Sequence, residues 1–173
     1  ETPGWWLDDG WHTVRANQWR APLYWEEVDG VWFSQTLSGF REVRLEEPVT
    51  HVSYYEADAF ARWLGVRLPR EDEWEVICRQ ARPEGANFVE SEQFHPVPLG
   101  PTLSRGPVQM YGDVWEWTAS PYVGYPGYAP LPGALGEYNG KFMSNTMVLR
   151  GGSCATSLTH IRPTYRNFFA PET

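Results

Sequence analysis

Basic, amide and aromatic side chains come together near the end of the sequence, in the stretch His-Ile-Arg-Pro-Thr-Tyr-Arg-Asn-Phe-Phe. Arg162 and Arg166 can pair with carboxylates. Asn167 can hold a carboxylate or an imidazole, and the faces of Phe168 and Phe169 attract organic cations. The same side chains can also anchor a fold, because arginine in such a segment more often pairs with a structural Asp or Glu. The stretch therefore predicts either a small-molecule site or a structural anchor.

Motifs for other kinds of chemistry are not found in the sequence. The 4 histidines are isolated, and no pair has the i, i+4 spacing of a helical metal site. No Gly-rich phosphate loop and no Gly-x-Ser-x-Gly elbow occurs. Asp113 and Glu116 could form an acid–base pair, but strand alternation sends them to opposite faces, which favours structural hydrogen bonding for both. We therefore expect no metal ligand and no catalytic residue within this chain.

Cysteine usage gives a further expectation about chemistry and location. The sequence has 2 cysteines, Cys78 and Cys154, far apart along the chain. A disulfide between them is conceivable, but free thiols in a reducing cytosol are favoured for a chain of this size. Cys78 falls on the inner face of an expected helix, which favours a core residue over a nucleophile. The expected location is cytoplasmic.

Size and composition restrict the class of protein. A chain of 173 residues is long enough for one domain with a sizeable core. The formal charge of -8 argues against a surface for nucleic acid or for an anionic membrane. No apolar run approaches the roughly 20 residues of a membrane helix. Aromatic residues make up 16% of the chain, and Trp and Tyr suit pockets, half-buried loops and interfaces.

Two helices are expected to position the other elements. The first begins with a capping box formed by Ser53 and Glu56 and stops at Gly65. The second runs from Glu71 to Gln80, with acidic residues in its first turn, where the helix dipole favours them. The residues expected to face the core are Ala57, Phe60, Ala61 and Leu64 in the first helix, and Trp74, Ile77 and Cys78 in the second.

The first part of the chain is expected to be irregular. Residues 1–50 contain spaced tryptophans, which favour an aromatic-stapled lobe over a Trp-lined ligand groove. Within it, residues 21–25 and 31–33 read as two short strands about a turn at 26–30.

Strands and a long loop are expected in the second half. Residues 109–118 alternate side chains like a strand, and residues 147–149 form another apolar strand. Between them, residues 120–145 form a loop rich in Tyr, Gly and Pro. Loops of this length inside a compact domain are usually functional or disordered.

Several stretches together resemble the formylglycine-generating-enzyme-like, or sulfatase-modifying-factor, family. They run in the family's order and consist of residues 48–57, 67–69 with 73–75, 112–117 and 149–153. The resemblance implies an α+β fold of the C-type-lectin-like kind. In that fold two helices pack on small, twisted antiparallel sheets with extensive loops, and we expect residues 1–173 to form one such domain.

Within that family, further stretches resemble the sulfoxide synthases of ergothioneine biosynthesis, the hercynine oxygenases. They are residues 9–11, 22–25, 137–143 and 160–169. The resemblance implies an oxidoreductase that uses a mononuclear non-haem Fe(II) and O2. Such enzymes join a thiol, γ-glutamylcysteine or cysteine, to the imidazole of trimethylhistidine as a sulfoxide. Their iron ligands lie in an N-terminal helical bundle, so we expect this chain to be a fragment, inactive alone, that lacks this bundle and the family's last strand.

The resemblance also assigns site residues. In the synthases, the segment that matches Asn167–Phe169 faces the iron cleft between two domains and helps to hold trimethylhistidine. Tyr138 lies in the region where some synthases place an active-site tyrosine. Arg162 and Arg166 are candidates for pairing with substrate carboxylates.

Three departures from the family pattern affect the expected chemistry. Formylglycine-generating enzymes carry a cysteine pair after the Gly-Gly-Ser turn, where Thr156 and Ile161 stand here. Cys154 directly follows Ser153 and is out of register, which argues against oxidation of a substrate cysteine. Arg70 occupies a position where the family often has a helix-capping threonine. That cap must come from elsewhere, at a cost of about 1 kcal/mol if it is lost.

A second class of function stays open: a non-catalytic C-type-lectin-like module whose loop 120–145 recognises a ligand. Fold alone cannot decide between the two, because one fold hosts many functions. An upstream His-x-x-x-His-x-Glu helix in the same protein supports the enzyme, and its absence supports the module.

Overall fold

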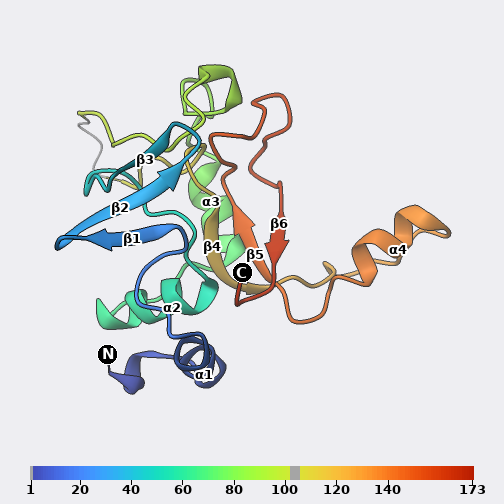
Figure 1. Ribbon diagram of the computed structural model, residues 1–173. Coiled ribbons are helices and arrows are strands. Elements are labelled where there is room, and N and C mark those ends of the chain that lie inside the picture. The colour runs from blue at the N-terminus through green and yellow to red at the C-terminus, as the bar shows by residue number, and fades with distance from the viewer. Residues whose placement is uncertain (1, 102–105) are drawn as a thin grey trace.

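The structure is a computed structural model that describes residues 2–101 and 106–173 (Figure 1). The described residues form four α-helices and two three-stranded antiparallel sheets, which confirms the predicted α+β class. None of these helices is both long and apolar enough to cross a membrane. The helices are α1 (Asp8–Asn17), α2 (Tyr54–Trp63), α3 (Glu71–Cys78) and α4 (Ala134–Gly140), with 3-10 turns η1 (Pro3–Trp5) and η2 (Val89–Ser91). The strands are β1 (Trp25–Val28), β2 (Val31–Thr36), β3 (Gly39–Glu42), β4 (Glu116–Pro121), β5 (Met147–Arg150) and β6 (Asn167–Phe169).

Helix α2 begins at the predicted capping box. The Ser53 hydroxyl accepts a hydrogen bond from the Glu56 N–H at 3.2 Å, and the Glu56 carboxylate accepts one from the Ser53 N–H at 2.8 Å. The helix ends at Trp63, and Gly65 follows with a φ of 73°. Both predicted ends are therefore confirmed within two residues.

The predicted core face of α2 is wrong for its two largest members. Phe60 and Leu64 are 59% and 54% exposed, whereas Tyr54 and Tyr55 are buried. Tyr54 meets the ring of Trp117 in β4 edge-on, with the ring centroids 5.9 Å apart. Because tyrosine rings supply large apolar surfaces, they make the core contacts that the prediction gave to Phe60 and Leu64.

Helix α3 carries Trp74 and Cys78 into the core as predicted, with exposed fractions of 1% and 0%. The inward placement of Ile77 is wrong, since this side chain is 43% exposed. The helix buries a narrow stripe through Trp74 and Cys78, and Ile77 lies beside that stripe. A distant strand supplies the missing cap: the Ser120 hydroxyl of β4 accepts a hydrogen bond from the Glu71 N–H at 3.0 Å.

Helix α1 occupies a segment for which the sequence predicted only an irregular lobe. No side-chain cap precedes the helix, because Leu7 stands at the N-cap position, and Gly10 lowers its helix propensity. Packing requires this glycine: a Cβ at position 10 would lie 2.8 Å from the Tyr55 Cβ of α2. Gly10 is therefore present because α1 packs closely on Tyr55 of α2, and not because it favours a helix.

The predicted hairpin in the first lobe is present with shifted ends. Strands β1 and β2 pair antiparallel, and Asp29 and Gly30 join them with φ values of 50° and 81°. Positive φ at both central residues is typical of a type I′ turn, whose twist suits a hairpin. Strand β3 pairs with the other edge of β2 and was not predicted.

The second sheet has the order β4-β5-β6. Strand β5 confirms the strand predicted at residues 147–149. The strand predicted at 109–118 is wrong in its first part, because pairing with β5 begins only at Glu116. Gly112 and Asp113 have φ values of 77° and 52°, which turn the chain and end the alternation there.

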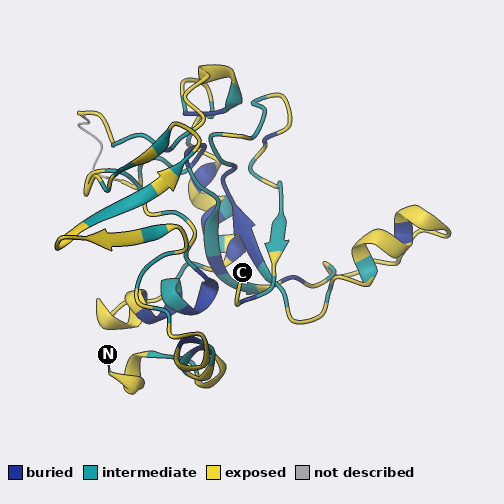
Figure 2. Cartoon of the chain, viewed as in Figure 1, coloured by how far each residue is buried: buried dark blue, intermediate teal, exposed yellow. Residues whose placement is uncertain are grey.

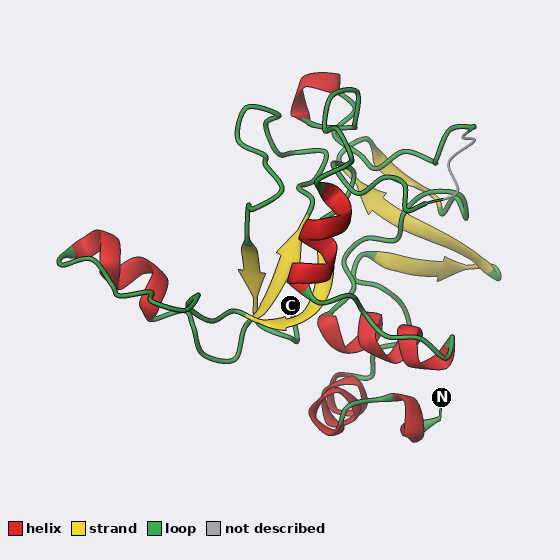
Figure 3. Cartoon of the chain, turned by 180° about the vertical axis from the view of Figure 1, so that it is seen from behind, coloured by secondary structure: helices red, strands yellow, loops and turns green. Residues whose placement is uncertain are grey.

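Residues 122–146 form an arm that projects from this second sheet (Figure 1), and Figure 2 shows that most of the arm is exposed. The loop predicted at 120–145 is thus partly helical, because it contains α4. The Tyr122 N–H donates to the Thr146 carbonyl at 2.9 Å and closes the base of the arm. From behind, α4 again lies away from the other helices and the sheets (Figure 3).

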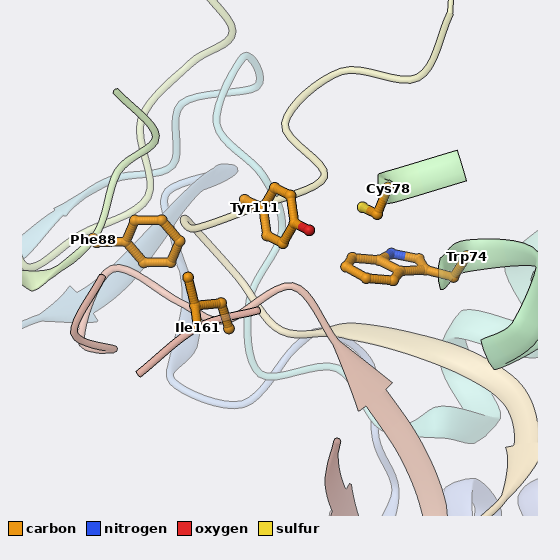
Figure 4. Packing of buried hydrophobic residues seen from close by; sticks show 5 residues of the cluster. All are labelled: Trp74, Cys78, Phe88, Tyr111 and Ile161. Carbon is orange, nitrogen blue, oxygen red and sulfur yellow. The ribbon is translucent and has the colours of Figure 1, made fainter. Parts of the chain in front are cut away.

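The core lies between α3 and the segments that follow it. Its central cluster consists of Trp74, Cys78, Phe88, Tyr111 and Ile161 (Figure 4). The rings of Trp74 and Tyr111 meet edge-on, with centroids 5.7 Å apart. Gly152 approaches this cluster so closely that a Cβ there would lie 3.0 Å from the Phe88 ring. The Arg-Gly-Gly-Ser turn is therefore part of the packing of the fold.

Candidate substrate-binding surface

Strand β6 holds three of the candidate residues. Along it, Asn167, Phe168 and Phe169 pair with Leu149, Val148 and Met147 of β5, respectively. Successive side chains of a strand point to opposite faces of the sheet. Asn167 and Phe169 therefore share one face, and Phe168 lies on the other.

The face that bears Phe168 carries an aromatic cluster. The Phe168 ring stacks on Tyr122, with centroids 4.1 Å apart and planes inclined by 12°, and lies 5.8 Å from the Phe142 ring. Tyr138 of α4 meets the Phe142 ring at 5.2 Å. The structure thus joins Phe168 and Tyr138 through a continuous series of aromatic contacts. Sequence reasoning did not assign Tyr122 or Phe142 to the site, although both lie in stretches that it singled out.

The opposite face of β6 presents Asn167 and Phe169. The Asn167 side-chain oxygen accepts a hydrogen bond from the Phe168 N–H at 2.9 Å. Within the described residues its Nδ2 atom meets no acceptor, so both amide hydrogens are available to a bound carboxylate. The Phe169 side chain is 44% exposed and can offer a ring face to an organic cation.

Arg166 is held by the scaffold next to this strand. Its Nε atom lies 2.9 Å from a carboxylate oxygen of Glu71, and its Nη1 atom donates to the Val123 carbonyl at 3.0 Å. The guanidinium also lies over the rings of Tyr122 and Tyr125, at 4.6 and 4.5 Å from their centroids. These contacts favour the structural role that the sequence left open for Arg166.

Arg150, the first residue of the Arg-Gly-Gly-Ser turn, fixes the same region from inside. Its side chain is 0% exposed, and Nη2 lies 2.8 Å from Glu71 and 3.4 Å from Glu75 of α3. Its Nη1 atom donates to the carbonyls of Pro163 at 2.7 Å and Tyr165 at 3.3 Å. A buried guanidinium requires such pairing. The same contacts tie α3 to the segment that leads into β6.

Arg162 lies apart from the other candidates. Its guanidinium sits over the Tyr165 ring at 5.2 Å, and the Tyr165 hydroxyl is 2.8 Å from Nε2 of His160. Arg162 is exposed and forms no ion pair within residues 2–101 and 106–173, so its charge is open to solvent. The structure therefore brings together Phe168, Tyr138 and Arg166, and it leaves Arg162 at a separate position.

Asp113 and Glu116 form the structural hydrogen bonds that the sequence favoured. Asp113 accepts hydrogen bonds from the Asn87 amide at 2.7 Å and from the Val97 N–H at 2.9 Å. Glu116 accepts one from the indole N–H of Trp74 at 2.5 Å. Burial raises the pKa of the Glu116 carboxyl to about 7, against the opposing effect of this hydrogen bond.

No group of three or more His, Cys, Asp or Glu side chains suited to a metal ion occurs in the described part of the chain. The four histidines have different contact partners, although His51 and His95 are close enough to interact electrostatically. Each of them lies beside its own neighbour: His12 beside Asp8, His51 beside Tyr24, His95 beside Glu47 and His160 beside Tyr165.

A family model described as the sulfatase-modifying factor enzyme 1-like domain matches residues 6–173. The chain belongs to this family. The matched residues include both sheets and every α-helix of the described structure. The surface around β6 therefore belongs to the family's domain, as the core does.

The relatives of this sulfatase-modifying-factor-like chain carry several names. Hercynine oxygenase of Mycobacterium tuberculosis is 36% identical over 96% of this chain and 43% of its own length. Hercynine oxygenase of Mycolicibacterium smegmatis is 35% identical over 99% of this chain and 44% of its own length. Inactive C-alpha-formylglycine-generating enzyme 2 of Bos taurus is 36% identical over 58% of this chain. The chain thus spans less than half of the hercynine oxygenases that it matches.

Thr156 and Ile161, which follow the Gly-Gly-Ser turn, have structural roles in this chain. The Thr156 hydroxyl accepts a hydrogen bond from the Ser153 N–H at 3.0 Å, and Ile161 packs in the core. Both cysteines are free. Burial raises the pKa of the Cys78 thiol to about 12 and also raises that of Cys154. Neither environment favours the reactive thiolate form.

Proposed function

We propose that this chain is the substrate-binding part of a non-haem Fe(II)- and O2-dependent sulfoxide synthase. The enzyme would join γ-glutamylcysteine or cysteine to trimethylhistidine, also called hercynine. The observation that carries the proposal is the 35% to 36% identity to proteins named hercynine oxygenase over 96% to 99% of the chain.

The described residues do not fit an iron centre of their own, because no three metal-ligating side chains converge among them. The proposal therefore assigns the iron ligands to polypeptide outside this chain. The matched relatives are more than twice as long as the region that they share with it, which leaves room for such a part.

Asn167 and Phe169 are proposed to hold trimethylhistidine, because they share the face of β6 that has free hydrogen-bond donors and an exposed ring. The Asn167 amide would donate to the substrate carboxylate. The Phe169 ring would receive the trimethylammonium group, a contact worth about 0.5 to 2 kcal/mol. Phe168 would fix the strand from its other face through Tyr122.

The remaining candidates have different proposed parts. Tyr138 would act from the opposite face of β6, since only the Phe142 ring separates it from Phe168. Arg162 is free to pair with a carboxylate of the thiol substrate. Arg166 would hold β6 in place, because Glu71 already occupies its guanidinium.

Substrate binding by the full-length protein tests these roles. Asn167→Ala should weaken binding of trimethylhistidine about tenfold in calorimetric titration, because a hydrogen bond to a charged group is lost. Asn17→Ala on α1 is the matched control and should leave the affinity unchanged. Phe169→Leu should weaken binding of trimethylhistidine more than binding of histidine, since only the former carries the methylated cation. Equal affinities of wild type and Asn167→Ala would remove this residue from the site.

A non-catalytic ligand-binding module is the second candidate. One observation favours it: a relative that shares part of this chain is named an inactive formylglycine-generating enzyme. The full-length protein decides between the two. Consumption of O2 that requires both trimethylhistidine and the thiol supports the synthase, whereas ligand binding without consumption of O2 supports the module.

A further inference from the structure

Helix α4 ends in the pair Asn139 and Gly140. Among the asparagines of the sequence, Asn139 is the one that glycine follows, and the others precede Gln, Phe or Thr. The backbone nitrogen of a residue can attack the side-chain amide of a preceding asparagine. Glycine makes this attack easiest, because it has no Cβ to hinder the approach and its backbone is the most mobile. The end of α4 therefore carries the residues for an intramolecular reaction.

Packing does not require the glycine at position 140. A Cβ there would meet no atom within 4 Å of the described structure, and the residue has a helical backbone. Gly136 in the same helix differs, because a Cβ at that position would overlap the Leu131 carbonyl oxygen. Glycine weakens a helix relative to alanine. Gly140 thus loosens the end of α4 without making room for a neighbour in the described structure.

The end of α4 has the freedom that the reaction needs. In a helix the Gly140 nitrogen does not face the side-chain carbon of Asn139, so the backbone of Asn139 must first leave the helical conformation. Asn139 is exposed and lies in the last turn, where helices fray. The helix has 7 residues and no side-chain cap, and helices this short are marginal in water. Local opening of one turn is therefore sufficient, and the core stays folded.

The Tyr122 hydroxyl is placed to assist the attack. It donates a hydrogen bond to the side-chain oxygen of Asn139 at 3.3 Å. Its ring is held by stacking on Phe168, with centroids 4.1 Å apart. Burial raises the pKa of Tyr122, which keeps the hydroxyl in its donating form. Negative charge grows on the amide oxygen as the nitrogen adds to the carbonyl, and a fixed donor stabilises that charge.

We propose that Asn139 is a site of spontaneous deamidation in the folded protein, with Tyr122 as the donor to its side-chain oxygen. The Gly140 nitrogen forms a bond to the side-chain carbon of Asn139, and the bond from this carbon to Nδ2 breaks. The amide proton of Gly140 leaves with Nδ2 as ammonia, and a cyclic imide remains. Water then opens the ring at either carbonyl, which gives aspartate or isoaspartate. Water is the only other reactant.

The product changes the surroundings of Tyr138. In isoaspartate the chain runs through the former side chain, and the former backbone carbonyl of residue 139 becomes a free carboxylate. The Phe142 N–H, which donates to that carbonyl at 3.3 Å, then loses its position. The rings of Tyr138 and Phe142 lie 5.2 Å apart, one on each side of this pair in sequence. Conversion therefore disturbs the aromatic contacts that join Tyr138 to Phe168. The inference goes beyond the proposed function and does not depend on it.

Ageing of the full-length protein tests the proposal. The protein is kept at physiological temperature and mildly alkaline pH, and its peptides are then mapped by mass spectrometry with detection of isoaspartate. Aspartate and isoaspartate should accumulate at position 139 faster than at Asn17, Asn87, Asn145 or Asn167, which are controls in the same sample. The same protein unfolded in urea supplies the reference rate. If residue 139 stays asparagine in the folded protein and converts in urea, the proposal is overturned.

Two variants test the parts of the site. Gly140→Ala should slow the conversion at least about fivefold, from the difference in helix propensity between glycine and alanine. Gly4→Ala is the matched control, since a Cβ there also meets no atom within 4 Å, and it should age as wild type. Tyr122→Phe keeps the ring and should slow the conversion about two- to tenfold, because one hydrogen bond is lost.

The rates of these variants can also overturn the proposal. A Gly140→Ala protein that converts at the wild-type rate would exclude the attack by the residue 140 nitrogen as the limiting step. A Tyr122→Phe protein that converts as fast as wild type, or faster, would overturn the role of the hydroxyl. These measurements use no substrate, so their failure is distinguishable from failure of the proposed function.

Discussion

The buried carboxyl of Glu116 gives the most direct test of the reasoning about the fold. This side chain enters the interior from β4 and accepts one hydrogen bond, from the Trp74 indole at 2.5 Å. Burial raises its pKa from 4.5 to about 7. Glu116→Gln keeps the shape of the side chain and an acceptor for Trp74, and it removes the ionisation.

The sign of the effect follows from where the proton is bound. Between pH 4.5 and about 7 the folded state keeps a proton on Glu116 that the unfolded state has released. The free energy of unfolding therefore falls as the pH rises through this window. A shift of this size corresponds to about 3 kcal/mol over the whole window, which Glu116→Gln should abolish.

Urea unfolding of the chain near pH 5 and near pH 8, in buffer with EDTA, measures this difference. Wild type and Glu116→Gln should be similar near pH 5, and the variant should be more stable by about 2 to 3 kcal/mol near pH 8. The lowered pKa of His51 acts in the opposite direction, but it is common to both proteins and cancels in the comparison. Glu26→Gln on the exposed part of β1 is the matched control and should behave as wild type. A Glu116→Gln protein less stable than wild type near pH 8 would refute the reasoning, because the carboxylate would then be stabilised rather than penalised.

Three further substitutions test contacts of the scaffold by urea unfolding. Ser120→Ala should cost about 1 kcal/mol, because the Glu71 N–H loses its cap, and Ser120→Thr should restore most of it. Arg150→Met should cost about 3 to 5 kcal/mol, since it removes one of the two arginines that pair with Glu71 and leaves the carbonyls of Pro163 and Tyr165 without their donor. Gly112→Ala should cost about 3 kcal/mol, because φ is 77° there and the new Cβ would lie 2.6 Å from the Asn87 carbonyl oxygen. Unchanged stability in any of these variants would contradict the contact that it tests.

Local signals in the sequence were sufficient where the chain makes its own contacts. The capping box of Ser53 and Glu56 predicted the start of α2, because both partners lie within one turn. The acidic residues in the first turn of α3 indicated where that helix starts. Its cap could not be predicted, since Ser120 is 49 positions away from Glu71. Helix α1 was not predicted although Asp8 and Asp9 lie in its first turn, because Leu7 provides no cap and Gly10 is selected by its contact with Tyr55 and not by helix propensity.

The candidate surface was predictable in composition but not in arrangement. The sequence indicated Asn167, Phe168 and Phe169 as a group, and strand pairing divides them between two faces. The sequence could not predict this division, because a strand of only 3 residues is too short to show the alternation of side chains. The roles of Tyr122 and Arg166 depend on contacts with distant segments, which no spacing in the sequence records.

The pairing of Arg166 with Glu71 has a consequence for how this surface can change over evolution. The residue that precedes β6 is held by a helix 95 positions earlier in the chain, while Asn167 and Phe169 make few contacts of their own. Substitutions on the outward face of β6 should therefore alter ligand preference without loss of the strand's position. If Asn167 and Phe169 bind the substrate as proposed, these two positions can change while the arginine–glutamate pair stays the same, and a protein engineer can vary them in the same way.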